Sequence, residues 1–141
     1  MEKSNELIFE EILKNPIFSK FCKDIKPFTK PFNRNLVDVK AIVLGADPSN
    51  PENKKLEYVF GLENESSPYF TPILKNLERL DLSLKNIYVQ NLCPNYFEDV
   101  TDENDAYIEI ATKYWLSYLK NELDTLFKPE IPVLITAWKP L

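Results

Sequence analysis

The residues whose types could do chemistry are polar groups placed just after apolar stretches. Asp47 follows the stretch AIVLG, and Asn91 ends the stretch NIYVQN. The sequence contains no histidine, so any catalysis within it must use carboxylates, amides, hydroxyls or lysines. Each candidate also has an ordinary structural explanation. Asp47, in the segment GADP, could simply form a turn, and Asn91 could be a buried amide that bonds to loop backbone. Phe60, the aromatic candidate, could simply be a core residue.

The composition predicts one globular domain over residues 1–141. The chain is 44% hydrophobic, and no apolar run approaches the roughly 18 residues of a membrane span. Two cysteines, Cys22 and Cys93, are too few for a disulfide framework or a four-ligand zinc site. We expect the protein to be cytoplasmic and to have no metal, no cofactor and no membrane partner. The net charge of −5 argues mildly against a broad nucleic-acid surface.

The elements that must position these residues alternate between strands and helices. Hydrophobic spacing and turn residues predict four helices, over 5–14, 16–24, 72–80 and 102–127. Ser4 is expected to cap the first of these and Thr71 the third. Strands are predicted over 39–45, 86–92 and 133–138. Residues 46–70 are expected to form a long polar loop. The core-facing stripe of the last helix is expected to comprise Ile108, Ala111, Trp115, Leu119, Leu123 and Leu126.

This order of elements predicts an α/β fold, with a central parallel sheet between two layers of helices. Ligands of such sheets bind beyond the carboxyl ends of the strands. Asp47 and Asn91 follow or end two of the expected strands, so the fold could bring them together.

Three segments together resemble the uracil-DNA glycosylase superfamily. They are VLGADP, then Phe60 thirteen residues after Asp47, then YVQNLCPNYF, and the resemblance covers about residues 38–138. VLGADP is similar to the Gly-Gln-Asp-Pro motif of the best-known branch, whereas QNLCP looks more like the single-strand-selective branch. The resemblance implies a three-layer uracil-DNA glycosylase-like fold and the removal of uracil, or a related base, from DNA during base-excision repair.

The resemblance also implies roles for individual residues. Asp47 would be catalytic, helping water to attack the sugar C1′. Ala46, Phe60 and Asn91 would bind the base, Phe60 by stacking and Asn91 by reading the uracil edge. Gly45, Pro48 and Ser49 would shape the pocket. The partner implied is DNA with uracil or a modified base that is single-stranded or flipped out of the helix.

The sequence departs from the family pattern in two places. Ser49 stands where the best-known branch has a tyrosine, so the pocket is expected to accept at least one 5-substituted uracil. The family's closing His-Pro-Ser segment, which stabilises the leaving uracil anion, does not occur in residues 1–141. We expect either a truncated domain or a protein that has lost this function, and little uracil release by these residues.

Two other functions remain open from the sequence. One is a non-catalytic binding or interaction module with the same fold, which the acidity of the chain and the missing segment favour. The other is an unrelated flavodoxin-like domain that binds a phosphate ligand. The expected glycine-rich phosphate loop is absent, because Gly45 and Gly61 are the only glycines.

Overall fold

Three parallel strands form the centre of the molecule. The computed structural model describes residues 4–33, 38–48, 56–98 and 106–136. Its strands are β1 (Ala41–Gly45), β2 (Ile87–Asn91) and β3 (Val133–Ile135), in the spatial order β2-β1-β3. β1 pairs with β2 from Ala41 opposite Ile87 to Gly45 opposite Asn91. The predicted mixed α/β fold with a parallel sheet is therefore confirmed.

The central strand β1 is apolar because both of its faces are covered. Its side chains alternate, so Ala41 and Val43 pack into one hydrophobic cluster while Ile42 packs into another. Val43 has no exposed surface. Burying one such side chain stabilises the fold by about 1.5–3 kcal/mol, which favours a continuous apolar strand at this position.

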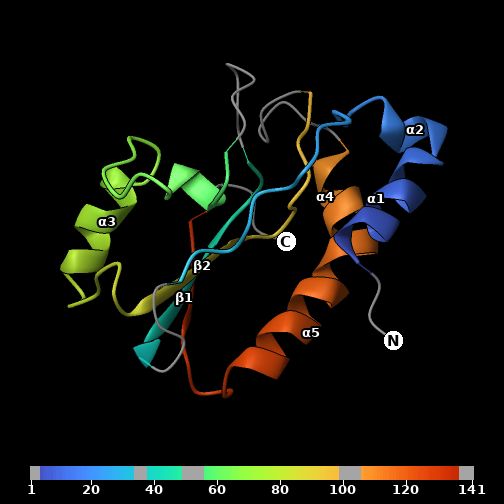
Figure 1. Cartoon of the computed structure of the whole chain (residues 1–141). Coiled ribbons are helices and arrows are strands. Elements are labelled where there is room, and N and C mark those ends of the chain that lie inside the picture. Colours follow the sequence, from blue (N-terminus) through green and yellow to red (C-terminus); the bar gives the residue numbers. More distant parts are fainter. Residues whose placement is uncertain (1–3, 34–37, 49–55, 99–105, 137–141) are drawn as a thin grey trace.

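Helices lie on both faces of the sheet (Figure 1). α3 (Thr71–Glu78) covers one face, and α1 (Asn5–Leu13), α4 (Tyr107–Ile110) and α5 (Leu116–Leu126) lie on the other. The larger core cluster lies on the α5 side and includes the fully buried Phe9, Ile110 and Trp115. Among the described residues, no helix is long and apolar enough to span a membrane.

The two N-terminal helices begin at capping side chains. Ser4 caps α1 as predicted, because its Oγ accepts a hydrogen bond from the backbone nitrogen of Leu7 at 3.3 Å. Asn15 caps α2 (Pro16–Ser19) in the same way. α2 ends well before the predicted residue 24, because Cys22 leaves the helix and forms an antiparallel bridge with Phe97.

The start of α3 differs from the prediction by one residue. Thr71 is the first helical residue and not the cap, a position that Phe70 occupies without a capping side-chain bond. The Thr71 hydroxyl instead donates to the carbonyl of Ser67 at 2.9 Å. Pro72 lies in the first turn as expected, because a proline there loses no helical hydrogen bond.

The last helix is interrupted by a wider turn. Ala111–Trp115 form a π-helical segment, η4, between α4 and α5, and residues 99–105 lie outside the described part. Ile110, Ala111, Trp115 and Leu119 are buried, whereas Ile108 is 45% exposed and Leu126 is also exposed. The predicted stripe was therefore wrong at both ends. A π turn inserts one extra residue into the helix, so the residues before it are rotated about the helix axis. Ile110 therefore takes the inward position that was expected for Ile108.

The last strand is shorter than predicted. β3 covers Val133–Ile135, and residues 137–141, which include the end of the expected strand, lie outside the described part. β3 pairs only with β1 among the described elements, with Val133 opposite Ile42.

The outer edge of β2 is covered by the segment that follows α2. The backbones of Phe32 and Val89 exchange two hydrogen bonds of 2.9 Å. The side-chain nitrogen of Asn33 donates to the carbonyl of Ile87 at 2.8 Å, and the side-chain oxygen of Gln90 accepts from the backbone nitrogen of Asn91 at 2.9 Å. Both backbone groups of Val89, the carbonyl of Ile87 and the nitrogen of Asn91 are thus already paired along this edge.

Candidate functional site

A pocket lies beyond the carboxyl ends of β1 and β2. Because these strands are parallel and end in register, Gly45 and Asn91 lie side by side. The pocket has a volume of about 180 Å³ and is lined by Asp47, Pro48, Leu56, Phe60, Tyr69 and Asn91. This volume is large enough for a small planar ring.

Gly45 leaves space for the side chains of Asn91 and Phe60. A Cβ atom at this position would lie 2.5 Å from the Oδ1 of Asn91 and 2.6 Å from the Cζ of Phe60. Atoms cannot approach so closely, so any larger residue would displace the amide or the ring. The absence of a side chain at the end of β1 therefore leaves room for both the Asn91 amide and the Phe60 ring, although Gly45 itself is not among the residues that line the pocket.

Phe60 is held in an unusual backbone conformation. It lies in the short 3-10 helix η2 (Val59–Gly61) with φ 56° and ψ 15°, which is the left-handed region. Such a conformation costs an ordinary residue roughly 1–2 kcal/mol. Two contacts hold it: the Ser67 hydroxyl donates to the Phe60 carbonyl at 2.6 Å, and the rings of Phe60 and Phe70 meet edge to face at 5.2 Å. The ring is therefore fixed before any ligand enters.

Asn91 is positioned by its neighbour on the strand. Asn91 is only 3% exposed, and its backbone nitrogen donates to the side-chain oxygen of Gln90. The side-chain nitrogen of Gln90 in turn lies 3.4 Å from the carboxylate of Glu122 on α5. Tyr88 donates to the same carboxylate at 2.8 Å. Within the described residues, no hydrogen bond occupies the side-chain amide of Asn91. One acceptor and one donor group are thus left for a ligand.

Asp47 lies next to two buried proton donors. It is half-buried, and its charge influences both Cys93 and Tyr107. Burial, reinforced by the charge of Asp47, raises the pKa of the Cys93 thiol well above its ordinary value. Burial and the neighbouring Cys93 and Asp47 likewise raise the pKa of the Tyr107 hydroxyl. Both groups therefore keep their protons at neutral pH, and Asp47 is the acidic side chain among the pocket-lining residues.

The remaining predicted site residues have different placements. Pro48 is buried and lines the pocket. Ala46 does not line it; its side chain packs against the α5-side core, and its carbonyl accepts from the Tyr107 hydroxyl at 3.1 Å and from the Cys93 nitrogen at 2.8 Å. Ser49 lies outside the described residues.

Two pocket residues could not be identified from the sequence. Leu56 and Tyr69 line the pocket, but both come from the long connection between β1 and α3. No periodicity marks an individual residue of such a loop. The only local signal was the run SSPYFTP, whose prolines indicate a turn without indicating which side chain faces a cavity.

A second groove is larger and mainly apolar. Its volume is about 370 Å³, and it lies between α5 and the β1–β3 side of the sheet, lined mainly by leucines and other apolar residues such as Ile42, Phe127 and Val133. Two of its polar residues, Lys120 and Asp124, form an ion pair with each other at 2.6 Å. The smaller pocket is therefore the better candidate, because its amide, carboxylate and aromatic ring converge on one space.

No metal centre accompanies the pocket. The described residues contain no group of three histidine, cysteine, aspartate or glutamate side chains that could hold a metal ion.

Comparisons of the chain with protein-family models, with curated proteins and with solved structures find no match.

Proposed function

We propose that the pocket binds a uracil-like base of DNA and that the protein is a uracil-DNA glycosylase-like base-excision protein. The observation that carries this proposal is the convergence of Asp47, Phe60 and Asn91, from three separate segments, on one pocket of about 180 Å³. A glycosylase needs these groups in one place, because it must hold a flipped-out base and attack the bond beside it.

Each group has a task in that chemistry. The Asn91 side chain can accept a hydrogen bond from uracil N3–H and donate one to O4, whereas cytosine presents the opposite pattern at both positions. Phe60 offers an aromatic ring against which a planar base can stack. Asp47 can accept a proton from an attacking water, and its negative charge would stabilise positive charge that develops on the sugar.

Binding is the first test of this proposal. Single-stranded oligonucleotides that differ only in one central uracil or cytosine are titrated with the protein, and affinity is followed by fluorescence anisotropy. We expect at least fivefold tighter binding of the uracil strand, because a mispaired buried polar group costs about 1–3 kcal/mol. Asn91→Ala should remove the difference, and Asp24→Asn, which changes an exposed carboxylate elsewhere, should keep it. Equal affinity of the wild type for both strands would contradict the proposal.

Catalysis is a separate test. Uracil release from the same oligonucleotide distinguishes an enzyme from a binding module, and Asp47→Asn should abolish any release while leaving uracil binding in place. The low release expected from residues 1–141 means that single-turnover conditions with excess protein are needed. The alternative, a binding module of the same fold, is supported by the net charge of −5 and the absence of histidine in this sequence. Uracil-selective binding without any release would favour that alternative.

A further inference from the structure

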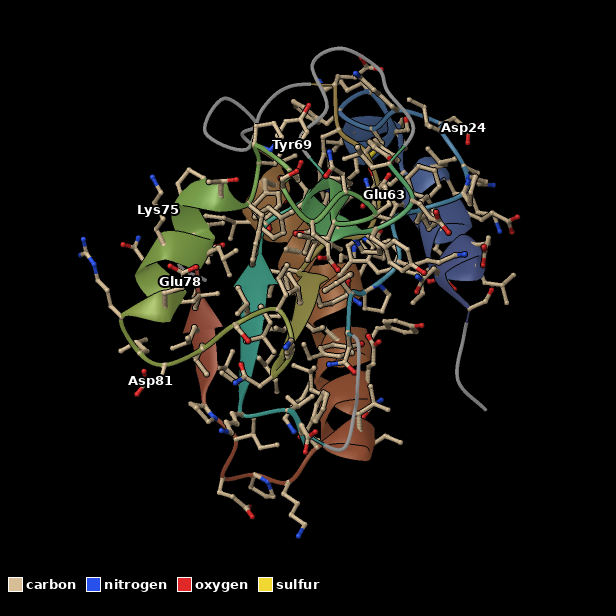
Figure 2. The ribbon with its side chains drawn as sticks, turned by 60° about the vertical axis from the view of Figure 1, so that its left-hand side comes forward. Asp24, Glu63, Tyr69, Lys75, Glu78 and Asp81 are labelled. Atoms are coloured by element: carbon tan, nitrogen blue, oxygen red, sulfur yellow. The ribbon has the colours of Figure 1, made fainter. Side chains whose placement is uncertain are left out.

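The two edges of the sheet differ in how they are covered. The β2 edge is bonded by Phe32 and Asn33. β3 is the outermost strand on the opposite side (Figure 2), and within the described part of the chain it pairs only with β1. An open edge presents unpaired backbone groups to any further strand. The β3 edge is therefore where this fold can accept one.

The outward backbone groups of β3 belong to Val133 and Ile135. The Pro132 carbonyl accepts from the Ile42 nitrogen at 2.9 Å, and the Thr136 nitrogen donates to the carbonyl of Leu44 at 2.9 Å, so residues 132 and 136 face β1. Successive residues of a strand turn their backbone groups to alternate sides, so those of Val133 and Ile135 face away from β1. Pro132 does not protect this edge, because its missing N–H group lies on the β1 side.

The side chains of the same two residues are apolar and exposed. Val133 is 45% exposed and Ile135 is 67% exposed, and both lie on one face of the strand. Val133 also lines the apolar groove of about 370 Å³, together with Leu119 and Leu123 of α5. Edge strands are usually protected by charged residues, prolines or bulges, whereas this one presents two β-branched apolar side chains. A partner strand would bury them.

We propose that β3 pairs in antiparallel fashion with β3 of a second copy of the chain, which joins the two sheets into one of order β2-β1-β3-β3-β1-β2. A two-fold axis through Leu134 places Val133 of each copy opposite Ile135 of the other. Such opposed residues exchange both of their backbone hydrogen bonds, so every outward group of Val133 and Ile135 gains a partner. Their exposed side chains cover one another across the axis.

The charges beside β3 favour a second copy as the occupant. Lys120 and Asp124 lie one turn apart on α5, are both exposed, and line the same groove as Val133. The two-fold axis reverses the direction of α5 in the second copy. The order of cation and anion along one helix therefore meets the order of anion and cation along the other, so this rim is complementary in charge to itself.

The interface leaves the candidate pocket free. Asn91, which lines the pocket, ends β2, the strand farthest from the axis in the joined sheet. The inference therefore goes beyond the proposed function and does not depend on it. A dimer that binds no uracil would contradict the proposed function alone, and a monomer that binds uracil would contradict the interface alone.

Sedimentation equilibrium over a wide range of protein concentrations tests the interface. We expect the wild type to associate reversibly into dimers. Ile135→Lys should raise the dissociation constant at least tenfold, because it places a charge next to Val133 of the partner strand. Ile17→Lys is the matched control, because it makes the same change of charge at an isoleucine of α2 that is 63% exposed, and it should keep the dimer. A wild type that stays monomeric, or equal weakening by both substitutions, would overturn the proposal.

A cysteine on the axis tests the register of the strands. Leu134 should face its own copy with the two Cα atoms about 4.5 Å apart, within the roughly 4.4–6.8 Å that a disulfide spans. Mild oxidation of Leu134→Cys should give a disulfide-linked dimer on a non-reducing gel, whereas Ile17→Cys should not.

A second variant covers the case in which Leu134→Cys does not fold. Val133→Cys combined with Ile135→Cys changes only exposed side chains and should form two bridges between the copies in the same register. A dimer in solution that neither variant cross-links would mean that another surface joins the copies, and the proposed pairing of β3 would be wrong.

Discussion

At the scale of single residues, the lack of a side chain at Gly45 determines how the pocket is built. Gly45 is the last residue of β1 and lies beside Asn91, which lines the pocket. Its missing Cβ is the space in which the Asn91 amide and the edge of the Phe60 ring approach each other. The glycine has a packing role here, and not a conformational one, because it is not among the residues with positive φ.

We predict that Gly45→Ala removes uracil binding and destabilises the fold. The new methyl group would overpack the contact between Asn91 and Phe60, and overpacking typically costs about 1–3 kcal/mol. Urea unfolding and anisotropy titration measure the two effects. Gly61→Ala is the comparison for stability alone, because it should cost a similar roughly 1–2 kcal/mol through its positive φ, and its new Cβ would lie 3.2 Å from the Ser67 Oγ and not between Asn91 and Phe60. Full uracil affinity in Gly45→Ala would contradict this role.

The residues of the pocket differ in how far the sequence could predict them. Gly45 and Asn91 end apolar stretches that could only be buried strands, and Asp47 follows one of them, so their common edge was predictable from the rule for parallel sheets. Leu56 and Tyr69 were not predictable, because their positions depend on how a long loop folds back over the strand ends. That path is set by tertiary contacts such as the Ser67–Phe60 hydrogen bond, which leave no periodic pattern in the sequence.

At the scale of elements, the π turn changes which residues of the last helix support the sheet. A continuous α-helix would place Ile108, Ala111 and Trp115 on one face, which is what the sequence pattern predicts. The wider turn at Ala111–Trp115 instead turns Ile110 inward and Ile108 outward. A one-residue difference of this kind cannot be read from hydrophobic spacing, because isoleucine occupies both positions.

Two alanine substitutions distinguish these alternatives. Ile110→Ala should lower the free energy of unfolding by about 2–5 kcal/mol, because Ile110 is fully buried in the larger core cluster. Ile108→Ala should change it by less than about 0.5 kcal/mol, as expected for an exposed residue. Urea denaturation of the two variants under the same conditions measures both values. A larger loss for Ile108→Ala would mean that the helix is continuous in solution.

At the scale of the whole molecule, the buried ionisable groups make the fold sensitive to alkali. Burial, together with Glu98, raises the pKa of the Cys22 thiol from 9.0 to about 12. Burial also raises the pKa values of Cys93, Tyr88 and Tyr107. The folded protein keeps these protons at pH values where the unfolded chain releases them, so alkali favours the unfolded chain.

We therefore predict that stability falls as the pH rises above about 9. The contribution of Cys22 is fully present below pH 9.0 and is lost progressively up to about pH 12. Each thiol that is ionised only in the unfolded chain lowers the free energy of unfolding by about 1.4 kcal/mol per pH unit. Urea unfolding across this range should show a smaller decline for Cys22→Ala than for the wild type. Equal declines would show that the Cys22 thiol ionises as readily in the folded protein as in the unfolded chain.

The covered edge of β2 has a consequence for self-association. An outer strand with unpaired backbone groups is a template on which another chain can add a strand and begin an aggregate. Here Phe32, Asn33 and Gln90 already pair with both backbone groups of Val89, the carbonyl of Ile87 and the nitrogen of Asn91. A second molecule therefore finds much of this ladder already taken, on the strand whose last residue, Asn91, lines the pocket. The covered edge opposes strand addition next to the pocket.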